Sequence, residues 1–210
     1  MGETNRKTLD TYGLAAADYI ANSPQTVEGY LQQWIDACFV DIPQDAPILE
    51  VGSGGGRDAD YLEGNLGFTN LDRSDASPAF VEHLRGRTEQ GAAQLNVLED
   101  EIATGKYRVI FADAVMLHFD DQELPIALEN IYRGLQDGGE FFFTTARPAG
   151  EVSASEWSNN KLGMDRYFNR LRESTLRQQL EMAGFAADDT VVLTDLSGKW
   201  YHVATRKVVA

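Results

Sequence analysis

Residues 48–58, ILEVGSGGGRD, place four glycines within five positions directly after a short apolar run. Glycine has no Cβ and adopts positive φ freely, but it costs roughly 0.5–1 kcal/mol relative to alanine inside regular structure. One glycine is enough for a tight turn, so four indicate a backbone that lets a ligand approach closely. Such a turn between a strand and a helix holds either a phosphate group or the sugar and tail of a nucleoside. The alternative is a strand–helix connection that binds nothing.

The spacing of these glycines argues against the two familiar phosphate-binding loops. A dinucleotide fingerprint counted from Gly52 needs a small residue at position 57, where Arg57 stands. A P-loop needs Gly-Lys followed by Ser or Thr, and this triplet does not follow. The pattern is instead an acid with alternating glycines, Glu50, Gly52, Gly54 and Gly56. The turn is therefore expected to bind a nucleoside without a pyrophosphate, and an NAD(P)-dependent oxidoreductase is the alternative enzyme class.

The amino-acid composition limits the classes of protein to which the chain can belong. The chain has 210 residues, with 43% hydrophobic and 24% charged residues, as expected for one soluble globular domain. It has no apolar run of membrane-spanning length, and its first residues lack the apolar core of a secretory signal, so we expect a cytoplasmic protein without membrane partners. Cys38 is the only cysteine, which excludes an intrachain disulfide and a thiolate metal cluster, and no metal site is expected. The net charge of −15 disfavours nucleic acid as a partner.

Hydrophobic periodicity predicts alternating helices and strands from about residue 28 to about residue 146. Strands are expected at 46–51, 68–75, 92–99, 107–115 and 140–146, and helices at 27–39, 57–65, 77–90 and 121–139. After a further helix at 174–185, two strand-like runs at 190–196 and 199–208 are joined by only Ser197 and Gly198, which predicts an antiparallel hairpin. The expected fold class is α/β: a Rossmann-like, doubly wound, mostly parallel sheet of seven strands that ends in an antiparallel hairpin.

Five segments, taken in order, resemble the motifs of class I S-adenosylmethionine-dependent methyltransferases. They are LEVGSGGGRDADYL, DASPAFVEHL, LNVLED, VIFADAVMLH and LQDGGEFFFTT, and the terminal hairpin resembles the family's reversed seventh strand. The resemblance covers roughly residues 28–207 and implies one methyltransferase domain over residues 1–210 that acts on a small-molecule acceptor. A non-catalytic nucleoside-binding protein on the same fold is a further alternative.

The resemblance implies an acid at the end of the second strand that accepts hydrogen bonds from both ribose hydroxyls. This acid is expected about 20 residues after the glycines, and Asp72 and Asp75 compete for the role. Asp75 stands before Ser-Pro and the start of a helix, as the family's acid does, so Asp75 is favoured over Asp72.

The resemblance also assigns residues of the glycine turn to the amino-acid end of the cofactor. Gly52, Ser53 and Gly54 belong to the loop beneath its methionine portion. Glu50 is expected to help hold the ammonium group through water or backbone, with a structural hydrogen bond as the alternative. Arg57 is expected to pair with the carboxylate, with a surface ion pair as the alternative.

The resemblance assigns a further group of residues to the adenine end of the cofactor and to the end of the fourth strand. Ala76 and Val97 are expected to flank the adenine ring, and Asn96 to accept a hydrogen bond from the adenine amino group. Asp113 and Ala114 end the fourth strand near the sulfonium, where Asp113 would bind the ammonium group or a substrate amine.

Two segments are expected to cover this edge of the sheet. Residues 1–27 resemble the helical cofactor lid of small-molecule methyltransferases, with Tyr19 facing the cofactor; a helix packed on the core is the alternative. The segment 146–174 is too long for a plain connection and is expected to cover the acceptor, which Arg147, Trp157 and Tyr167 would contact.

His118 follows the fourth strand and is expected near the transferable methyl group. It would act as a general base or position the nucleophile. The alternative is a packing or capping histidine. His83 and His202 are interpreted as structural.

Overall fold

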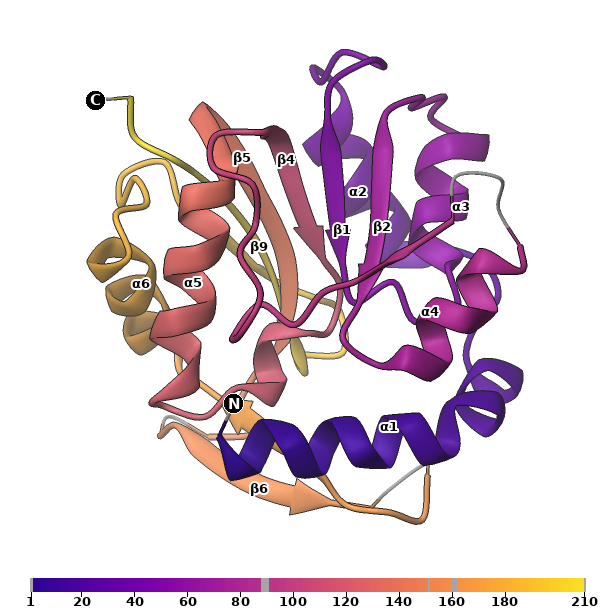
Figure 1. Ribbon diagram of the computed structural model, residues 1–210. Helices are drawn as coiled ribbons and strands as arrows, with labels where there is room; N and C mark the ends of the chain where they lie inside the picture. Colours follow the sequence, from indigo (N-terminus) through magenta and orange to yellow (C-terminus); the bar gives the residue numbers. More distant parts are fainter. Residues whose placement is uncertain (1, 88–90, 151, 160–161, 210) are drawn as a thin grey trace.

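The computed structural model describes residues 2–87, 91–150, 152–159 and 162–209. Seven strands form one sheet in the order β3-β2-β1-β4-β5-β9-β8 (Figure 1). Their bounds are β1 (Ile48–Val51), β2 (Leu71–Asp75), β3 (Ala93–Gln94), β4 (Tyr107–Ala112), β5 (Leu135–Ala146), β8 (Val191–Thr194) and β9 (Trp200–Arg206). β1 to β5 pair in parallel, and β9 runs antiparallel to both β5 and β8. The predicted fold class, including the reversed hairpin, is confirmed.

Helices cover both faces of the sheet because its central strands are apolar on both sides. All four residues of β1 are buried. On one face α2 (Gly29–Phe39) and α3 (Arg57–Gly64) pack Trp34, Ile35 and Leu62 against the sheet. On the other face α5 (Glu123–Gly134) and α6 (Glu173–Met182) contribute an apolar stripe made of Leu124, Leu128, Ile131, Leu176 and Leu180. The two apolar layers hold the strand ends in fixed relative positions.

Several predicted element bounds are wrong. β2 begins at Leu71 and not at residue 68, and β4 ends at Ala112 and not at residue 115. β3 has only two residues because the chain turns at Asn96, whose carbonyl accepts from the amides of Glu99 and Asp100. The helix expected over 121–139 ends at Gly134, whose missing Cβ leaves room for Ile102, and Leu135 already pairs with Tyr107 in the sheet. α4 spans Pro78–Arg85, and the end of its predicted range, 88–90, lies outside the described residues.

Two segments lie across the carboxyl ends of the parallel strands. Helix α1 (Glu3–Asn22) runs along this edge, and a separate hairpin of β6 (Ala154–Ser158) and β7 (Arg166–Arg170) lies against it (Figure 1). A short 3₁₀ turn, η1 (Met116–His118), follows β4 and contacts both. Segments far apart in the sequence are thereby brought to the point where the glycine turn leaves the sheet.

None of the helices in the described residues combines the length and the apolar character that a membrane span requires.

Candidate functional site

The glycine turn has a backbone that only glycine adopts without strain. Gly52, Gly54 and Gly56 have φ values of 76°, 52° and 88°. A Cβ on Gly52 would lie 2.4 Å from a methyl group of Val115, so a side chain would close the gap between the turn and the segment after β4. The turn therefore leaves bare backbone at the carboxyl edge of β1, and α3 begins directly after it at Arg57.

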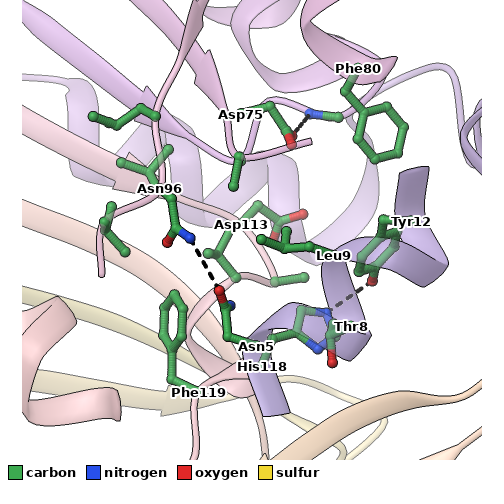
Figure 2. A pocket seen from close by; sticks show the side chains of 18 of the residues that line it. Asn5, Thr8, Leu9, Tyr12, Asp75, Phe80, Asn96, Asp113, His118 and Phe119 are labelled. Carbon is green, nitrogen blue, oxygen red and sulfur yellow. Dashed lines mark hydrogen bonds between the residues drawn. The ribbon is translucent and has the colours of Figure 1, made fainter. Parts of the chain in front are cut away.

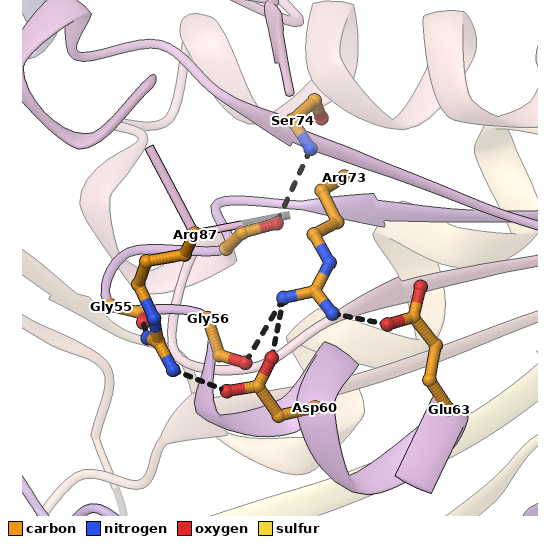
Figure 3. A network of polar contacts seen from close by, with 8 residues as sticks. Gly55, Gly56, Asp60, Glu63, Arg73, Ser74 and Arg87 are labelled. Atoms are coloured by element: carbon orange, nitrogen blue, oxygen red, sulfur yellow. Dashed lines mark hydrogen bonds and ion pairs between the residues drawn. The ribbon is translucent and has the colours of Figure 1, made fainter. Parts of the chain in front are cut away.

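Two arginines support this turn from below (Figure 3). The Arg73 side chain is 3% exposed and donates to the carboxylates of Asp60 and Glu63 and, at 3.5 Å, to the Gly56 carbonyl. Arg87 is 42% exposed and donates to the other oxygen of Asp60. Its Nη1 also donates to the Gly55 carbonyl. Asp60 therefore joins a buried and an exposed cation, and both cations hold carbonyls of the turn.

Asp75 and Asp72 have opposite surroundings. Asp75 is buried at the end of β2, where Oδ2 accepts from the Gly54 amide at 2.9 Å and Oδ1 accepts from the Ser77 amide at 2.8 Å. Burial raises the pKa of Asp75 to about 6, although both backbone bonds favour the charged form. Asp72 is half exposed and bonds Lys106 and Tyr107. Of the two candidates, only Asp75 lines a cavity.

A cavity of about 100 Å³ lies between Asp75 and helix α1 (Figure 2). Residues from the ends of β1, β2 and β4, from the segment after β3 and from α1 line it; they include Gly52, Gly54, Ala76, Asn96, Val97, Asp113 and Ala114. Asn96 donates from Nδ2 to Oδ1 of Asn5 at 3.2 Å and accepts from the Leu98 amide at 3.1 Å. These bonds place the Asn96 side chain at the wall of the cavity, where the adenine contact is expected.

A larger cavity of about 470 Å³ shares a wall with the first. Both are lined by Tyr12, Tyr19, Gly52, Gly54, Asp113, Ala114 and His118. On its far side the larger cavity is lined by aromatic and charged residues that include Tyr30, Arg166, Phe168, Asp195, Trp200 and His202. The two cavities together form a two-part cleft, and α1 contributes residues to both parts.

Carboxylates outnumber cations where the two cavities meet. Arg57 donates to Asp58 and, at 2.8 Å, to Asp113, whose other oxygen accepts from the Thr144 hydroxyl. Burial raises the pKa of Asp58 to about 6, with a further contribution from the nearby Asp113 charge. Ala114 holds a positive φ of 56°, and its amide donates to Thr144 Oγ1. This strained residue fixes Asp113 at the shared wall.

Glu50 lies beneath the glycine turn and is 2% exposed. Burial, followed by the Asp58 charge, raises the pKa of Glu50 to about 8. Its Oε2 has no hydrogen-bond partner among the described residues. Glu50 lines neither cavity, so any contact with a ligand would pass through water or the turn, as the sequence predicts. An unpartnered buried acid beside other acids fits a site that receives a cation.

His118 joins α1 to the β6–β7 hairpin (Figure 2). Its Nδ1 lies 2.6 Å from the Tyr167 carbonyl, which only accepts, so Nδ1 carries the proton. Nε2 then accepts from the Tyr12 hydroxyl at 2.9 Å, and that hydroxyl accepts from Arg166 at 3.0 Å. Burial lowers the pKa of His118 to about 4, which keeps the ring neutral at physiological pH. Both nitrogens are engaged, so the predicted role as a base would require Tyr12 to move.

The three predicted acceptor contacts lie outside the two cavities. Arg147 donates to the Gly198 carbonyl at 3.1 Å. Trp157 and Tyr167 pack on each other with ring centroids 5.5 Å apart, and Lys7 lies over Trp157. The sequence predicted no strand in this segment, and in β7 alternate residues face opposite sides. Arg166 and Phe168, on either side of Tyr167, line the larger cavity instead.

Sequence reasoning also missed the contribution of β9. His202 and Trp200 line the larger cavity, and Tyr30 of α2 joins them. They face it because β9 pairs antiparallel with β5, which places His202 opposite Thr144. The alternation of residue types along β9 was visible in the sequence. Which of its two faces lies toward the cavity depends on the pairing of Thr144 with His202, which are nearly 60 positions apart.

Comparisons with known proteins agree with this geometry. Residues 25–190 match a family described as a methyltransferase domain. A search of curated protein sequences finds no match. A 1,6-didemethyltoxoflavin-N1-methyltransferase from Burkholderia thailandensis superposes with a TM-score of 0.72 at 16% identity, covering 98% of this chain and 88% of that one. The DhpI–SAH complex gives a TM-score of 0.73 at 16% identity, covering 97% of each chain.

A third similar structure has a different printed activity. The [4+2]-cyclase SpnF superposes with a TM-score of 0.72 at 15% identity, covering 96% of this chain and 95% of that one. At these identities the structures show the fold alone.

The sheet with its reversed strand and the glycine turn beside a buried acid are the features of the class I methyltransferase fold. The chain belongs to the methyltransferase-domain family that matches residues 25–190. This match confirms the predicted class of enzyme, which uses S-adenosylmethionine.

Proposed function

We propose that this protein transfers the methyl group of S-adenosylmethionine to a small-molecule acceptor bound in the larger cavity, and that it works in the cytoplasm. The observation that carries the proposal is the excess of carboxylates where the two cavities meet. Asp58 and Asp113 share Arg57, while Glu50 is buried behind them with no partner for Oε2 among the residues that the structure describes. S-adenosylmethionine carries an ammonium and a sulfonium, which such a site attracts, whereas the pyrophosphate of NAD(P) would be repelled.

The residues of the cleft fit the parts of this cofactor in order. Asp75 would accept from the ribose hydroxyls, since each carboxylate oxygen keeps a free lone pair beside its backbone bond. Residues of the smaller cavity would hold the adenine, namely Ala76, Asn96 and Val97, and Gly52, Ser53 and Gly54 would lie beneath the methionine portion. Arg57 has further donors for the carboxylate, and Tyr19 of the lid helix would close over the ligand.

Positioning is the main task left to the protein. When bound, the cofactor supplies a methyl group that its sulfonium already makes electrophilic. Alignment of reacting groups contributes on the order of 7–11 kcal/mol of barrier reduction. Helix α1 and the β6–β7 hairpin cover the edge of the sheet where alignment is needed, which also excludes water. The net charge of −15 supports a free metabolite, and not nucleic acid, as the acceptor.

One alternative is a protein that binds the cofactor but catalyses another reaction. The observation that favours it is that SpnF has the same fold and is described as a cyclase. Transfer of label from methyl-labelled S-adenosylmethionine distinguishes the two functions. The proposal expects label on a small molecule when the protein is incubated with a metabolite extract. A protein that binds the cofactor and yields no labelled product would support a function other than methyl transfer.

Calorimetry on matched variants tests the cofactor site. We expect S-adenosylmethionine and S-adenosylhomocysteine to bind wild type, and NADH not to bind. Asp75→Ala should weaken binding by about 100-fold or more, since hydrogen bonds to a charged group contribute about 1.5–3 kcal/mol each. Asp72→Ala should leave binding unchanged because this exposed carboxylate pairs with Lys106 and Tyr107. Loss of binding in Asp72→Ala alone would overturn the assignment of the ribose acid.

A further inference from the structure

His202 occupies the part of the larger cavity that the cofactor residues leave open. It lies on β9 directly opposite Thr144 of β5, and opposed residues of an antiparallel pair share one face of the sheet. Thr144 donates to Asp113 at the wall between the two cavities. The His202 ring therefore lies on the same face as the residues that would surround the reacting methyl group.

The ring is packed by aromatic neighbours but forms no hydrogen bond within the described part of the chain. The edges of Tyr30 and Trp34 approach it, with ring centroids 4.9 and 5.1 Å away, and His202 is 5% exposed. Its Nδ1 is buried without a hydrogen-bond partner, and none of the described residues bonds Nε2. Buried polar groups are nearly always hydrogen-bonded in folded proteins. With Nδ1 enclosed, Nε2 is the nitrogen through which this ring can bond a molecule in the cavity.

The other two histidines differ from His202 in one feature each. His118 lines both cavities, but its two nitrogens are bonded to Tyr12 and to the Tyr167 carbonyl. His83 has a buried Nε2 without a partner among the described residues, but it lies on α4 and lines neither cavity. Among the described histidines, only His202 combines cavity lining with an unbonded ring.

We propose that Nε2 of His202 accepts the proton of the attacking group of a planar aromatic acceptor that carries a hydroxyl or ring N–H. This proposal rests on the proposed methyl transfer. The planar class follows from the rings around the cavity, since Tyr30, Phe168 and Trp200 offer flat apolar surface on several sides. In the transfer step the acceptor oxygen or nitrogen forms the bond to the methyl carbon. The carbon–sulfur bond breaks with its electron pair remaining on sulfur, and the acceptor proton moves to Nε2 and then to water.

A binding experiment with phenol tests this assignment without requiring turnover. The complex of the protein with S-adenosylhomocysteine, labelled with ¹⁵N in its histidines, is titrated with phenol and, as a non-planar control, with cyclohexanol. We expect saturable movement of the His202 ring-nitrogen signals with phenol only, while the His118 and His83 signals stay in place. Movement of no histidine signal, or equal movement with cyclohexanol, would overturn the proposal.

Two glutamine variants separate a role in the cavity from a role in folding. His202→Gln should weaken phenol binding by about 10-fold and leave S-adenosylhomocysteine binding unchanged, since a hydrogen bond contributes about 1 kcal/mol. His83→Gln should change neither affinity. Retained phenol affinity in His202→Gln would overturn this inference alone. Failure of wild type to bind S-adenosylhomocysteine would instead overturn the proposed function.

The pH profile of anisole formation from phenol gives an independent readout. Burial lowers the pKa of His202, while the carboxylates of Asp113 and Asp195 that face it act in the opposite direction. Wild type should therefore lose activity as pH falls below the ordinary histidine range, because a protonated ring cannot accept. His202→Gln should be about 100-fold slower and lack this acid limb. An unchanged profile in His202→Gln, or no anisole from wild type at any pH, would contradict the proposal.

Discussion

Asp75 on the glycine-turn side of the cleft and His202 on the acceptor side differ in how their polar atoms are satisfied. Around the turn, Asp75 accepts two backbone hydrogen bonds, and Arg73 and Arg87 hold carbonyls of the loop. On the acceptor side, His202 has no hydrogen bond among the described residues. A bonded network fixes geometry before a ligand arrives, while an unbonded buried group gains most when a ligand arrives. The difference indicates that Asp75 is held in place before a ligand binds, whereas His202 keeps bonding capacity for the proposed acceptor.

The first prediction breaks the network beneath the turn. Arg73→Met keeps the apolar stem but removes a buried charge that bonds Asp60 and Glu63. Removing one member of a buried ion pair costs about 3–5 kcal/mol. The carboxylates of Asp60 and Glu63 are partly exposed and can be hydrated in the variant, so we expect a smaller loss of about 2–3 kcal/mol in the free energy of unfolding. Urea denaturation measures this loss.

Arg87→Met is the matched control because Arg87 bonds the same Asp60 from an exposed position. An exposed pair contributes about 0–1 kcal/mol, so this variant should lose less than about 1 kcal/mol. Equal losses in the two variants would show that burial does not distinguish the two arginines.

The second prediction concerns the charge of Glu50 (folded-state pKa about 8). Between the ordinary carboxyl pKa and about 8, the folded protein binds a proton that the unfolded chain has released, so the free energy of unfolding falls as pH rises. Glu50→Gln removes this dependence and should stabilise the ligand-free protein at pH 8 by at least about 1 kcal/mol. Thermal denaturation at several pH values measures the change.

At about pH 9, above the raised pKa of Glu50, the same variant should weaken S-adenosylmethionine binding by about 10-fold, because a negative charge behind the turn is lost. At about pH 7, where Glu50 is protonated, the substitution should change the affinity little. A variant that gains stability and keeps full affinity at the higher pH would separate Glu50 from the cofactor. A variant without any change in its pH dependence would contradict the raised pKa of this residue.

The glycine-turn side could be predicted from the sequence because its information is local. Glu50, the glycines and Arg57 lie within eight positions, and a strand followed by a helix dictates their arrangement. Asp75 was separable from Asp72 because Ser-Pro marks a helix start directly after it. The bounds at β3 and at the start of β5 depend on a backbone turn at Asn96 and on contact between Gly134 and Ile102. Hydrophobic periodicity carries no information about either contact.

The acceptor side could not be predicted because its walls come from α1, β7 and β9. Which of two alternate residues faces a cavity depends on strand register, and a change of one position exchanges the two faces. This explains why Tyr167 was chosen where Arg166 and Phe168 line the cavity. His202 was interpreted as structural for the same reason, since its place opposite Thr144 follows only from the pairing of β5 with β9.

The third prediction loosens the helix that closes the cleft. The Tyr12 hydroxyl lies between His118 Nε2 and Arg166, so Tyr12→Phe leaves a buried nitrogen without its donor. An unsatisfied buried group costs about 1–3 kcal/mol, which should raise the dissociation rate of S-adenosylhomocysteine by about 10-fold. Stopped-flow displacement measures this rate.

Leu14→Ala is the control, because Leu14 lies on the same helix and is 80% exposed. It should leave the dissociation rate unchanged. A similar increase in both variants would attribute the effect to helix stability and not to the hydrogen bond with His118.

The last prediction compares the two faces of the hairpin and has the smallest expected effect. Trp157 is 41% exposed and packs on Tyr167 and Lys7 outside the cavities, so Trp157→Ala should change acceptor KM by less than about 2-fold. Phe168 lines the larger cavity, and Phe168→Ala should raise KM about 5-fold through lost ring contact. Initial rates with one acceptor measure both. In the described register only alternate residues of β7 face the cavity. A larger rise in KM for Trp157→Ala than for Phe168→Ala would therefore mean that the hairpin turns its other face toward the acceptor.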